Sequence, residues 1–120
     1  RAIRDVYKRQ VRDYIHVLDL AQAHVKGFDY LFTDSSTSQI FNLGTEHGYT
    51  VKEIYNTAEQ ILHQKIPYEI VARRAGDPAS VLANASKAKE FLNWQAFYSL
   101  KDIILSDYNW RMKAGNSLVD

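Results

Sequence analysis

The chain has 120 residues, 46% of them hydrophobic, which allows one domain or part of a larger one. Its net charge of +1, from 15 basic and 14 acidic side chains, argues against nucleic acid or an anionic membrane as a partner. Cysteine is absent, which excludes disulfides and thiol catalysis. No apolar run reaches the roughly 20 residues of a membrane helix. We therefore expect a cytoplasmic protein.

The first ten residues, RAIRDVYKRQ, are basic and polar and have no strand or helix period. We interpret residues 1–10 as a foreign leader, with a disordered native terminus as the alternative. Tyr14, Ile15 and Val17 then suit a short strand. The helix that follows has Asp19 in its first turn, where a carboxylate interacts favourably with the helix dipole. This helix carries one apolar stripe, made by Val17, Ala21, His24, Phe28 and Leu31.

The middle of the chain predicts a loop, a strand and a well-capped helix. Residues 33–38 are polar and loop-like, and residues 39–43 predict a buried strand that ends at Gly44. After a turn, Thr50 and Glu53 have the three-residue spacing of a capping box, which predicts the start of a helix.

The remainder predicts a strand at residues 67–71, a loop at 72–80, a short strand at 81–83, a helix at 85–92, and a last helix before a flexible tail at 114–120. Asn84 suits the cap of the first of these helices, and Ser99 with Asp102 suits the cap of the second. The fold class is therefore α/β, a small sheet with packed helices. We expect part of the apolar surface to face another domain, which would leave an aggregation-prone patch on the isolated chain.

Two arginine-containing segments, VRDYIHV and RRAGDP, lie roughly sixty residues apart. Arginine is the preferred side chain for bidentate recognition of phosphate. Convergence of Arg12 and Arg74 therefore predicts a diphosphate site. Salt bridges of these arginines with Asp13 and Asp77 are the alternative.

Asp77 can accept hydrogen bonds from hydroxyl groups such as those of a ribose. The same Gly76–Asp77–Pro78 run also suits a turn that needs no ligand, and both interpretations can hold together. Of the adjacent residues Arg73 and Arg74, we expect only one to face the pocket, because neighbouring side chains of an extended loop diverge.

Two other patterns are weaker. His16 and Asp19 could form a base and its orienting carboxylate, but His16 alternates with apolar neighbours, which favours a structural histidine. Residues 44–48 lie between a strand and a helix, yet they lack the Gly-x-Gly-x-x-Gly fingerprint and the Walker lysine, which favours a simple turn. No histidine pair has a metal-binding spacing.

From Val11 to about Met112 the chain resembles the C-terminal portion of UDP-glucose 4-epimerases, members of the extended short-chain dehydrogenase/reductase family. The resemblance lies in VRDYIHVLDLAQAH, IFNLGTEHGYTVKEI, IPYEIVARRAGDPASVLANASKAKEFLNW and SLKDII, in this order. It implies that residues 11–113 are the substrate-binding part of a Rossmann-type sugar-nucleotide epimerase.

The resemblance also implies a function: NAD-dependent interconversion of UDP-glucose and UDP-galactose in galactose metabolism. On this basis Arg12 and Arg74 hold the UDP diphosphate, Asp77 holds the uridine ribose hydroxyls and Tyr14 lines the same site. Val81 occupies a sugar-pocket position whose bulk affects whether N-acetylated sugars fit, so UDP-N-acetylhexosamines are expected as further substrates. The full-length enzyme is expected to be a homodimer.

The chain departs from the family by lacking the glycine fingerprint and the catalytic Tyr-x-x-x-Lys pair. We therefore expect an N-terminal domain outside this chain to bind NAD, and we expect no catalytic residue and no epimerase activity in the chain alone. Two alternatives remain open: a stand-alone, non-catalytic module that binds UDP-sugars or another anion, and part of a related nucleotide-sugar dehydratase, decarboxylase or epimerase.

Overall fold

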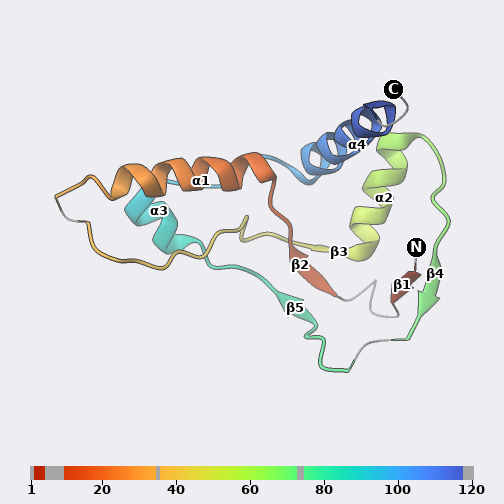
Figure 1. Cartoon of the computed structure of the whole chain (residues 1–120). Helices are drawn as coiled ribbons and strands as arrows, with labels where there is room; N and C mark the ends of the chain where they lie inside the picture. The colour runs from red at the N-terminus through yellow and green to blue at the C-terminus, as the bar shows by residue number, and fades with distance from the viewer. Residues whose placement is uncertain (1, 5–9, 35, 73–74, 118–120) are drawn as a thin grey trace.

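The computed structural model describes residues 2–4, 10–34, 36–72 and 75–117. The molecule is flat, with principal extents of 54 × 43 × 22 Å. Helices α1 (Val17–Tyr30) and α3 (Ser86–Leu92) lie at one end, α2 (Val51–Leu62) and α4 (Leu100–Ser117) lie at the other, and a small sheet lies between them (Figure 1). The sheet is therefore the element that connects the two helical ends.

The principal core lies between α1 (Val17–Tyr30) and α3 (Ser86–Leu92), which pack against each other. Trp94 follows α3 and is only 1% exposed, and its indole N–H donates to the carbonyl oxygen of Asp19 at 2.9 Å. A buried indole usually needs such a partner, so this bond fixes how the two helices meet. The buried apolar residues of this core are Ala23, Ala85, Ala88, Leu92 and Trp94.

The central sheet has three strands in the order β3-β2-β5. Its middle strand, β2 (Val11–Asp13), is antiparallel to β3 (Gly48–Thr50) and parallel to β5 (Ser80–Val81). A second pair joins β1 (Ala2–Arg4) in parallel to β4 (Glu69–Val71). Small sheets with packed helices confirm the predicted α/β class.

At the other end, α2 (Val51–Leu62) packs against α4 (Leu100–Ser117). The predicted capping box of α2 is confirmed: the Thr50 hydroxyl accepts a hydrogen bond from the Glu53 N–H at 3.1 Å, and the Glu53 carboxylate accepts one from the Thr50 N–H at 2.7 Å. Because α2 has no fully buried residue, its cap is an important part of what holds it in place.

Of the two caps predicted for the later helices, that of α4 is confirmed: Ser99 and Asp102 exchange backbone-to-side-chain hydrogen bonds of 2.9 and 3.2 Å at its start. The prediction of Asn84 as the cap of α3 is wrong, because the helix begins at Ser86, one residue later than predicted, and its N-cap is Ala85, which has no side-chain cap bond. The Asn84 side chain still accepts from the Ser86 N–H at 3.0 Å. The end of α4 differs from the prediction, because the helix continues to Ser117 across part of the expected tail. Residues 118–120 lie outside the described residues.

The capping box makes α2 sensitive to acid. Hydrogen bonds from the Thr50 backbone and hydroxyl hold the pKa of Glu53 below its ordinary value of 4.5. The Glu53 carboxylate therefore binds a proton more readily in the unfolded chain than in the folded one. Its contribution to stability is complete above the pKa of Glu53 in the unfolded chain, and it is lost as pH falls through the pKa of Glu53 in the folded chain. We expect Glu53→Gln to flatten this part of the stability curve, measured as the urea midpoint between about pH 6 and about pH 3. Glu90→Gln, at an exposed position of α3, removes the same charge as a control; identical curves for wild type and Glu53→Gln would contradict the expectation.

Several strands lie at other residues than predicted. The first strand is residues 11–13, whereas residues 14–16 are irregular and lead into α1, because pairing with β3 and β5 is available only to residues 11–13. Residues 39–43 are not a strand in the structure, since no described strand lies beside them. Conversely, β3 forms within the predicted turn, and residues 2–4 of the predicted leader form β1. The origin of residues 1–10 stays a prediction.

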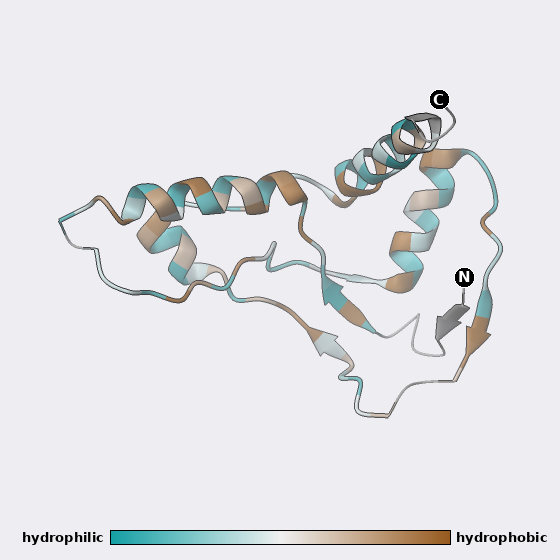
Figure 2. Cartoon of the chain, viewed as in Figure 1, coloured by the Kyte–Doolittle hydropathy of each residue, from teal (hydrophilic) through white to brown (hydrophobic). Residues whose placement is uncertain are grey.

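The apolar stripe predicted on α1 faces solvent in this chain. Its large members Val17, Phe28 and Leu31 are 61–69% exposed, whereas the buried positions of the helix are Asp19 and Ala23. Figure 2 shows hydrophobic residues recurring along the helix. We call the exposed set the α1 outer face; it comprises Val17, Leu18, Val25, Phe28 and Leu31. The chain therefore exposes the kind of apolar patch that was expected of a part of a larger protein.

Candidate substrate-binding site

Arg12 lies in the middle strand of the central sheet and its side chain is half-buried. Its Nη1 donates to the carbonyl oxygens of Val11 at 2.9 Å and of Pro78 at 3.1 Å. The Val11 N–H also donates to the carbonyl oxygen of Ala79 at 2.8 Å. These bonds join β2 to a loop that is 66 residues away in sequence. The N–H groups of Nη1 are thereby engaged, and the edge formed by Nη2 and Nε donates to no other described residue.

Three further predicted site residues lie on the same part of the sheet. Asp77 directly precedes Pro78, so the Arg12 guanidinium lies beside the loop that carries this carboxylate. Val81 is the partner of Arg12 in the parallel β2–β5 ladder and is 48% exposed. Tyr14 follows β2 directly and is half-buried. The fold thus brings Arg12 of the first segment to Pro78 of the second and to Val81 of the adjacent strand.

The predicted convergence of Arg12 with Arg74 stays a prediction, because Arg73 and Arg74 lie outside the described residues. The alternative salt bridge from Arg12 to Asp13 is wrong. Adjacent residues of a strand point to opposite faces, and the carboxylate of Asp13 accepts its hydrogen bonds elsewhere.

Asp13 binds the turn that leads into β3. Its carboxylate accepts hydrogen bonds from the Thr45 N–H at 2.9 Å, the Thr45 hydroxyl at 2.7 Å and the Glu46 N–H at 3.0 Å. A longer contact of 3.4 Å comes from the N–H of Ala83, just after β5. Sequence reasoning considered Asp13 only as an ion-pair partner. Its place next to Arg12 is the one sequence signal that could have directed attention to it.

The glycine turn at residues 44–48 is closed to a phosphate group. A Cβ at Gly44 would lie 2.5 Å from a carboxylate oxygen of Asp13, so this oxygen already occupies the space that the glycine leaves open. The neighbouring N–H groups of Thr45 and Glu46 donate to the same carboxylate. The turn therefore does not fit the pyrophosphate of a dinucleotide such as NAD, in agreement with its reading as a simple turn.

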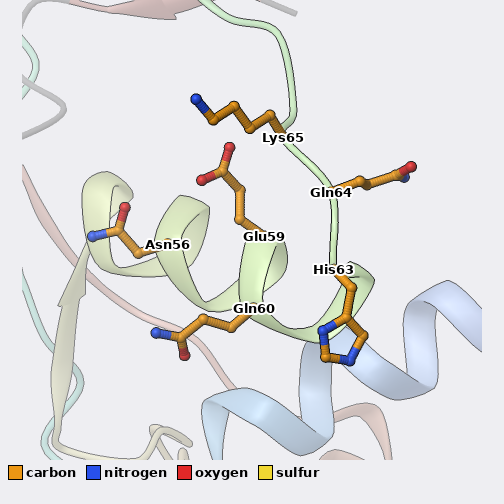
Figure 3. A pocket seen from close by; sticks show the side chains of 6 residues that line it. All are labelled: Asn56, Glu59, Gln60, His63, Gln64 and Lys65. Carbon is orange, nitrogen blue, oxygen red and sulfur yellow. The ribbon is translucent and has the colours of Figure 1, made fainter.

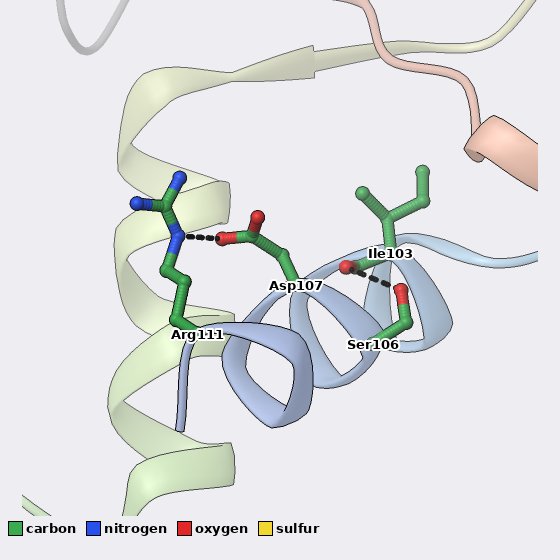
Figure 4. Close-up of polar contacts among 4 residues, drawn as sticks. All are labelled: Ile103, Ser106, Asp107 and Arg111. Atoms are coloured by element: carbon green, nitrogen blue, oxygen red, sulfur yellow. Dashed lines mark hydrogen bonds and ion pairs between the residues drawn. The ribbon is translucent and has the colours of Figure 1, made fainter. Parts of the chain in front are cut away.

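His16 is a structural histidine, as predicted. It is 4% exposed; Nδ1 accepts from the Leu18 N–H at 3.0 Å, and Nε2 lies 2.9 Å from the Ser106 hydroxyl oxygen. The Ser106 hydroxyl donates to the carbonyl oxygen of Ile103 (Figure 4), so the proton shared with the histidine belongs to Nε2. With Nε2 as the donor, the imidazole is not arranged as a base for Ser106. Asp19 does not orient His16 either, because its carboxylate accepts from other backbone groups.

Two of the surface pockets lie outside the candidate substrate-binding site. One, of about 490 Å³, follows the end of α2 and is lined by Glu59, His63 and Lys65 among other polar residues (Figure 3). Glu59 is engaged structurally: its hydrogen bond raises the pKa of Tyr55 to about 12. The other, of about 500 Å³, lies beside α4 and is mainly apolar. Neither pocket is lined by a predicted site residue.

Within the described ranges, no group of three or more acidic, histidine or cysteine side chains could hold a metal ion. Across that same part of the chain, no helix combines the length and apolar character needed to span a membrane.

No protein-family model matches the chain. The UDP-glucose 4-epimerase of Bifidobacterium longum subsp. longum is 44% identical over 110 residues, which are 92% of this chain and 32% of that protein. The crystal structure of a B. longum UDP-glucose 4-epimerase with NAD+ and UDP has a TM-score of 0.79, with 89% of this chain and 31% of that one covered. This chain is related to the C-terminal portion of UDP-glucose 4-epimerases.

A second solved structure extends the relationship. The UDP-glucose-4-epimerase from Stenotrophomonas maltophila, with bound NAD and formylated UDP-arabinopyranose, is 38% identical with a TM-score of 0.84, and 90% of this chain and 32% of that one are covered. The predicted resemblance to UDP-glucose 4-epimerases is therefore confirmed. The chain spans about a third of the length of the curated relatives it matches. The two solved epimerase structures contain NAD, with UDP in one and formylated UDP-arabinopyranose in the other.

Proposed function

We propose that this chain is the UDP-sugar-binding portion of an NAD-dependent UDP-glucose 4-epimerase that interconverts UDP-glucose and UDP-galactose. The observation that carries the proposal is the hydrogen bond from Arg12 to Pro78, which joins the two arginine-containing segments VRDYIHV and RRAGDP. Arg12 and Arg74 would hold the diphosphate, Asp77 the ribose hydroxyls of uridine, and Tyr14 would line the site.

The state of the Arg12 guanidinium supports this role. Its Nη1 is held by two carbonyl oxygens, so the group is pre-oriented, and the opposite edge retains the paired N–H geometry that suits a phosphate. A pre-oriented cation loses less conformational entropy when the ligand binds. Firm binding of the nucleotide, remote from the reacting carbon, lets the sugar turn between the two hydride-transfer orientations.

The glycine turn at residues 44–48 does not fit the pyrophosphate of NAD, because the carboxylate of Asp13 fills it. We propose that the part of the enzyme outside this chain binds NAD, supplies the catalytic residues and covers the α1 outer face. On this proposal the chain alone has no epimerase activity, and the full-length enzyme is a cytoplasmic homodimer in galactose metabolism. A stand-alone binding module is less favoured, because the α1 outer face leaves a large apolar area exposed.

Arg12→Ala is expected to weaken binding of UDP by roughly 10- to 100-fold, the equivalent of one or two charge-assisted hydrogen bonds. Arg12→Lys is expected to lose nearly as much, because an ammonium group does not reproduce the fork. Isothermal titration with UDP and with uridine measures both effects. The control is Arg111→Ala, which removes the same charge from an exposed pair with Asp107 on α4. Equal UDP affinity in wild type and Arg12→Ala would refute the proposed site.

Val81 is proposed to lie at the sugar end of the site, where its small side chain leaves room for an N-acetyl group. An intact epimerase that carries valine at this position is expected to turn over UDP-N-acetylglucosamine as well as UDP-glucose. Val81→Tyr is expected to lower turnover of the N-acetylated sugar by more than tenfold while UDP-glucose turnover changes little, as a steric exclusion requires. Coupled assays with the two substrates measure the ratio, and turnover of UDP-glucose alone by the valine enzyme would contradict this assignment.

A further inference from the structure

We propose that Asp13 is a positioning residue for Arg12, and that its carboxylate holds the central sheet in the register that directs the guanidinium toward the diphosphate. This inference rests on the proposed function, because it explains the hydrogen bonds of Asp13 by the need to orient Arg12 in the UDP site. The two residues are adjacent in β2, yet their side chains bind different elements. Arg12 contacts the loop before β5, and Asp13 contacts the turn before β3.

The contacts of Asp13 span the whole width of the sheet. On one side, the carboxylate accepts from Thr45 and Glu46, which lead into β3. On the other side, one of its oxygens lies 3.4 Å from the N–H of Ala83, which follows β5. The side chain of Asp13 in β2 therefore contacts both the turn before β3 and the residues after β5.

The register of β5 depends on few bonds, because this strand has only two residues, Ser80 and Val81. Its entry is held by the Val11 N–H on Ala79 and by Arg12 on Pro78. Its exit lies beside Asp13. If the exit shifts, the carbonyl of Pro78 shifts with it, and Arg12 loses one of the two acceptors that orient Nη1.

The turn that receives Asp13 is built around this carboxylate. Consecutive N–H groups of Thr45 and Glu46 form a concave donor pair of the kind that binds anions. Gly44 has no Cβ, and an added one would lie 2.5 Å from the carboxylate. Glu46 adopts a positive φ of 60°, and its own carboxylate accepts from the Ala85 N–H at 2.7 Å. The anion that this turn holds is thus the side chain next to Arg12.

The test compares UDP and uridine as ligands for the full 120-residue chain. Asp13→Ala is expected to weaken UDP binding by about tenfold, the loss of one charge-assisted hydrogen bond, while uridine binding changes by less than about twofold. In an Arg12→Ala background, the same substitution is expected to have no further effect on UDP. Asp29→Asn, at an exposed position of α1, removes the same charge as a control.

Milder variants keep the test valid if Asp13→Ala does not fold. Asp13→Asn retains an acceptor for Thr45 but presents N–H groups to Glu46, and Thr45→Val removes only one donor. Each is expected to reduce the preference for UDP over uridine by less than Asp13→Ala does. Equal losses for UDP and uridine, or an undiminished effect in the Arg12→Ala background, would overturn the proposal.

A ligand-free measurement separates this inference from the proposed function. In nitrogen-15 NMR spectra, the two carbonyl acceptors of Nη1 are expected to slow hydrogen exchange and rotation of this group, so that wild-type Arg12 gives a resolved Nη1–H signal, and Asp13→Asn is expected to broaden it. An unchanged signal in Asp13→Asn overturns the positioning role, whatever the chain binds. If the signal changes but wild type binds UDP no better than uridine, the positioning role stands and the proposed function is wrong.

Discussion

Replacing Asp19 by alanine is expected to destabilise the chain by about 2–4 kcal/mol, because two backbone donors lose a charged acceptor. The Asp19 side chain is 1% exposed, and its carboxylate accepts from the N–H groups of Phe97 at 3.0 Å and Tyr98 at 3.1 Å. It also lies in the first turn of α1, where a negative charge is favoured. Equilibrium unfolding in urea, followed by circular dichroism, measures the loss.

The matched control for this prediction is Asp29→Ala, on the exposed side of the same helix. This change is expected to alter stability by less than about 0.5 kcal/mol, as is usual for surface positions. Asp19→Asn is expected to be intermediate, since its amide oxygen can accept from one of the two donors while its amide N–H groups oppose the other. A urea midpoint of Asp19→Ala within error of wild type would show that water replaces the carboxylate at no cost.

Asp19 also shows what local sequence patterns can and cannot predict. Its position in the first helical turn follows from the pattern, but its partners Phe97 and Tyr98 are 78 and 79 residues away. The capping boxes of α2 and α4 were predictable because donor and acceptor are three residues apart. A strand was wrongly predicted at residues 39–43, and the strand at residues 48–50 was missed, because pairing depends on neighbours that are distant in sequence.

The sequence predicted that Val17, Phe28 and Leu31 of the α1 outer face share one side of the helix, but it did not predict that this side is exposed. Periodicity identifies which residues share a side of a helix, and it does not identify which side the rest of the chain covers. In α1 the covered side contains Asp19 and Ala23, and the apolar side containing Phe28 is exposed. A chain that spans about a third of its relatives can have such a face, because the apolar pattern reflects the whole protein.

The candidate site was predictable to the extent that side-chain chemistry and the resemblance indicated it. Arg12 and Asp77 stand out as a phosphate-binding fork and a hydroxyl acceptor, and the fold places them close together through Pro78. Asp13 does not stand out, because its partners are 32 to 70 residues away and, apart from the Thr45 hydroxyl, are backbone N–H groups, which carry no sequence signal. Residues that position a site are therefore harder to find from sequence than those expected to touch the ligand.

Gly48→Ala is expected to cost about 2–3 kcal/mol of stability, as overpacking of a close contact does, and to weaken UDP binding. A Cβ at Gly48 would lie 2.1 Å from Cγ1 of Val11 and 2.7 Å from Cδ2 of Leu82. Val11 is β-branched and stiff at χ1, so it cannot rotate away cheaply. The backbone of β2 would have to move instead, and Arg12 is the next residue along that strand. Urea unfolding and titration with UDP measure the two effects.

Gly27→Ala is the matched control, because a Cβ at this position in α1 meets nothing within 4 Å. It is expected to stabilise the chain by about 0.5–1 kcal/mol, the usual gain from replacing a glycine inside a helix. Combining Gly48→Ala with Val11→Ala removes the closest clash and is expected to recover part of the lost stability as a coupling energy between the two sites. If Gly48→Ala is as stable as wild type, or if Val11→Ala recovers nothing, the close approach of β3 to β2 does not determine where Arg12 lies.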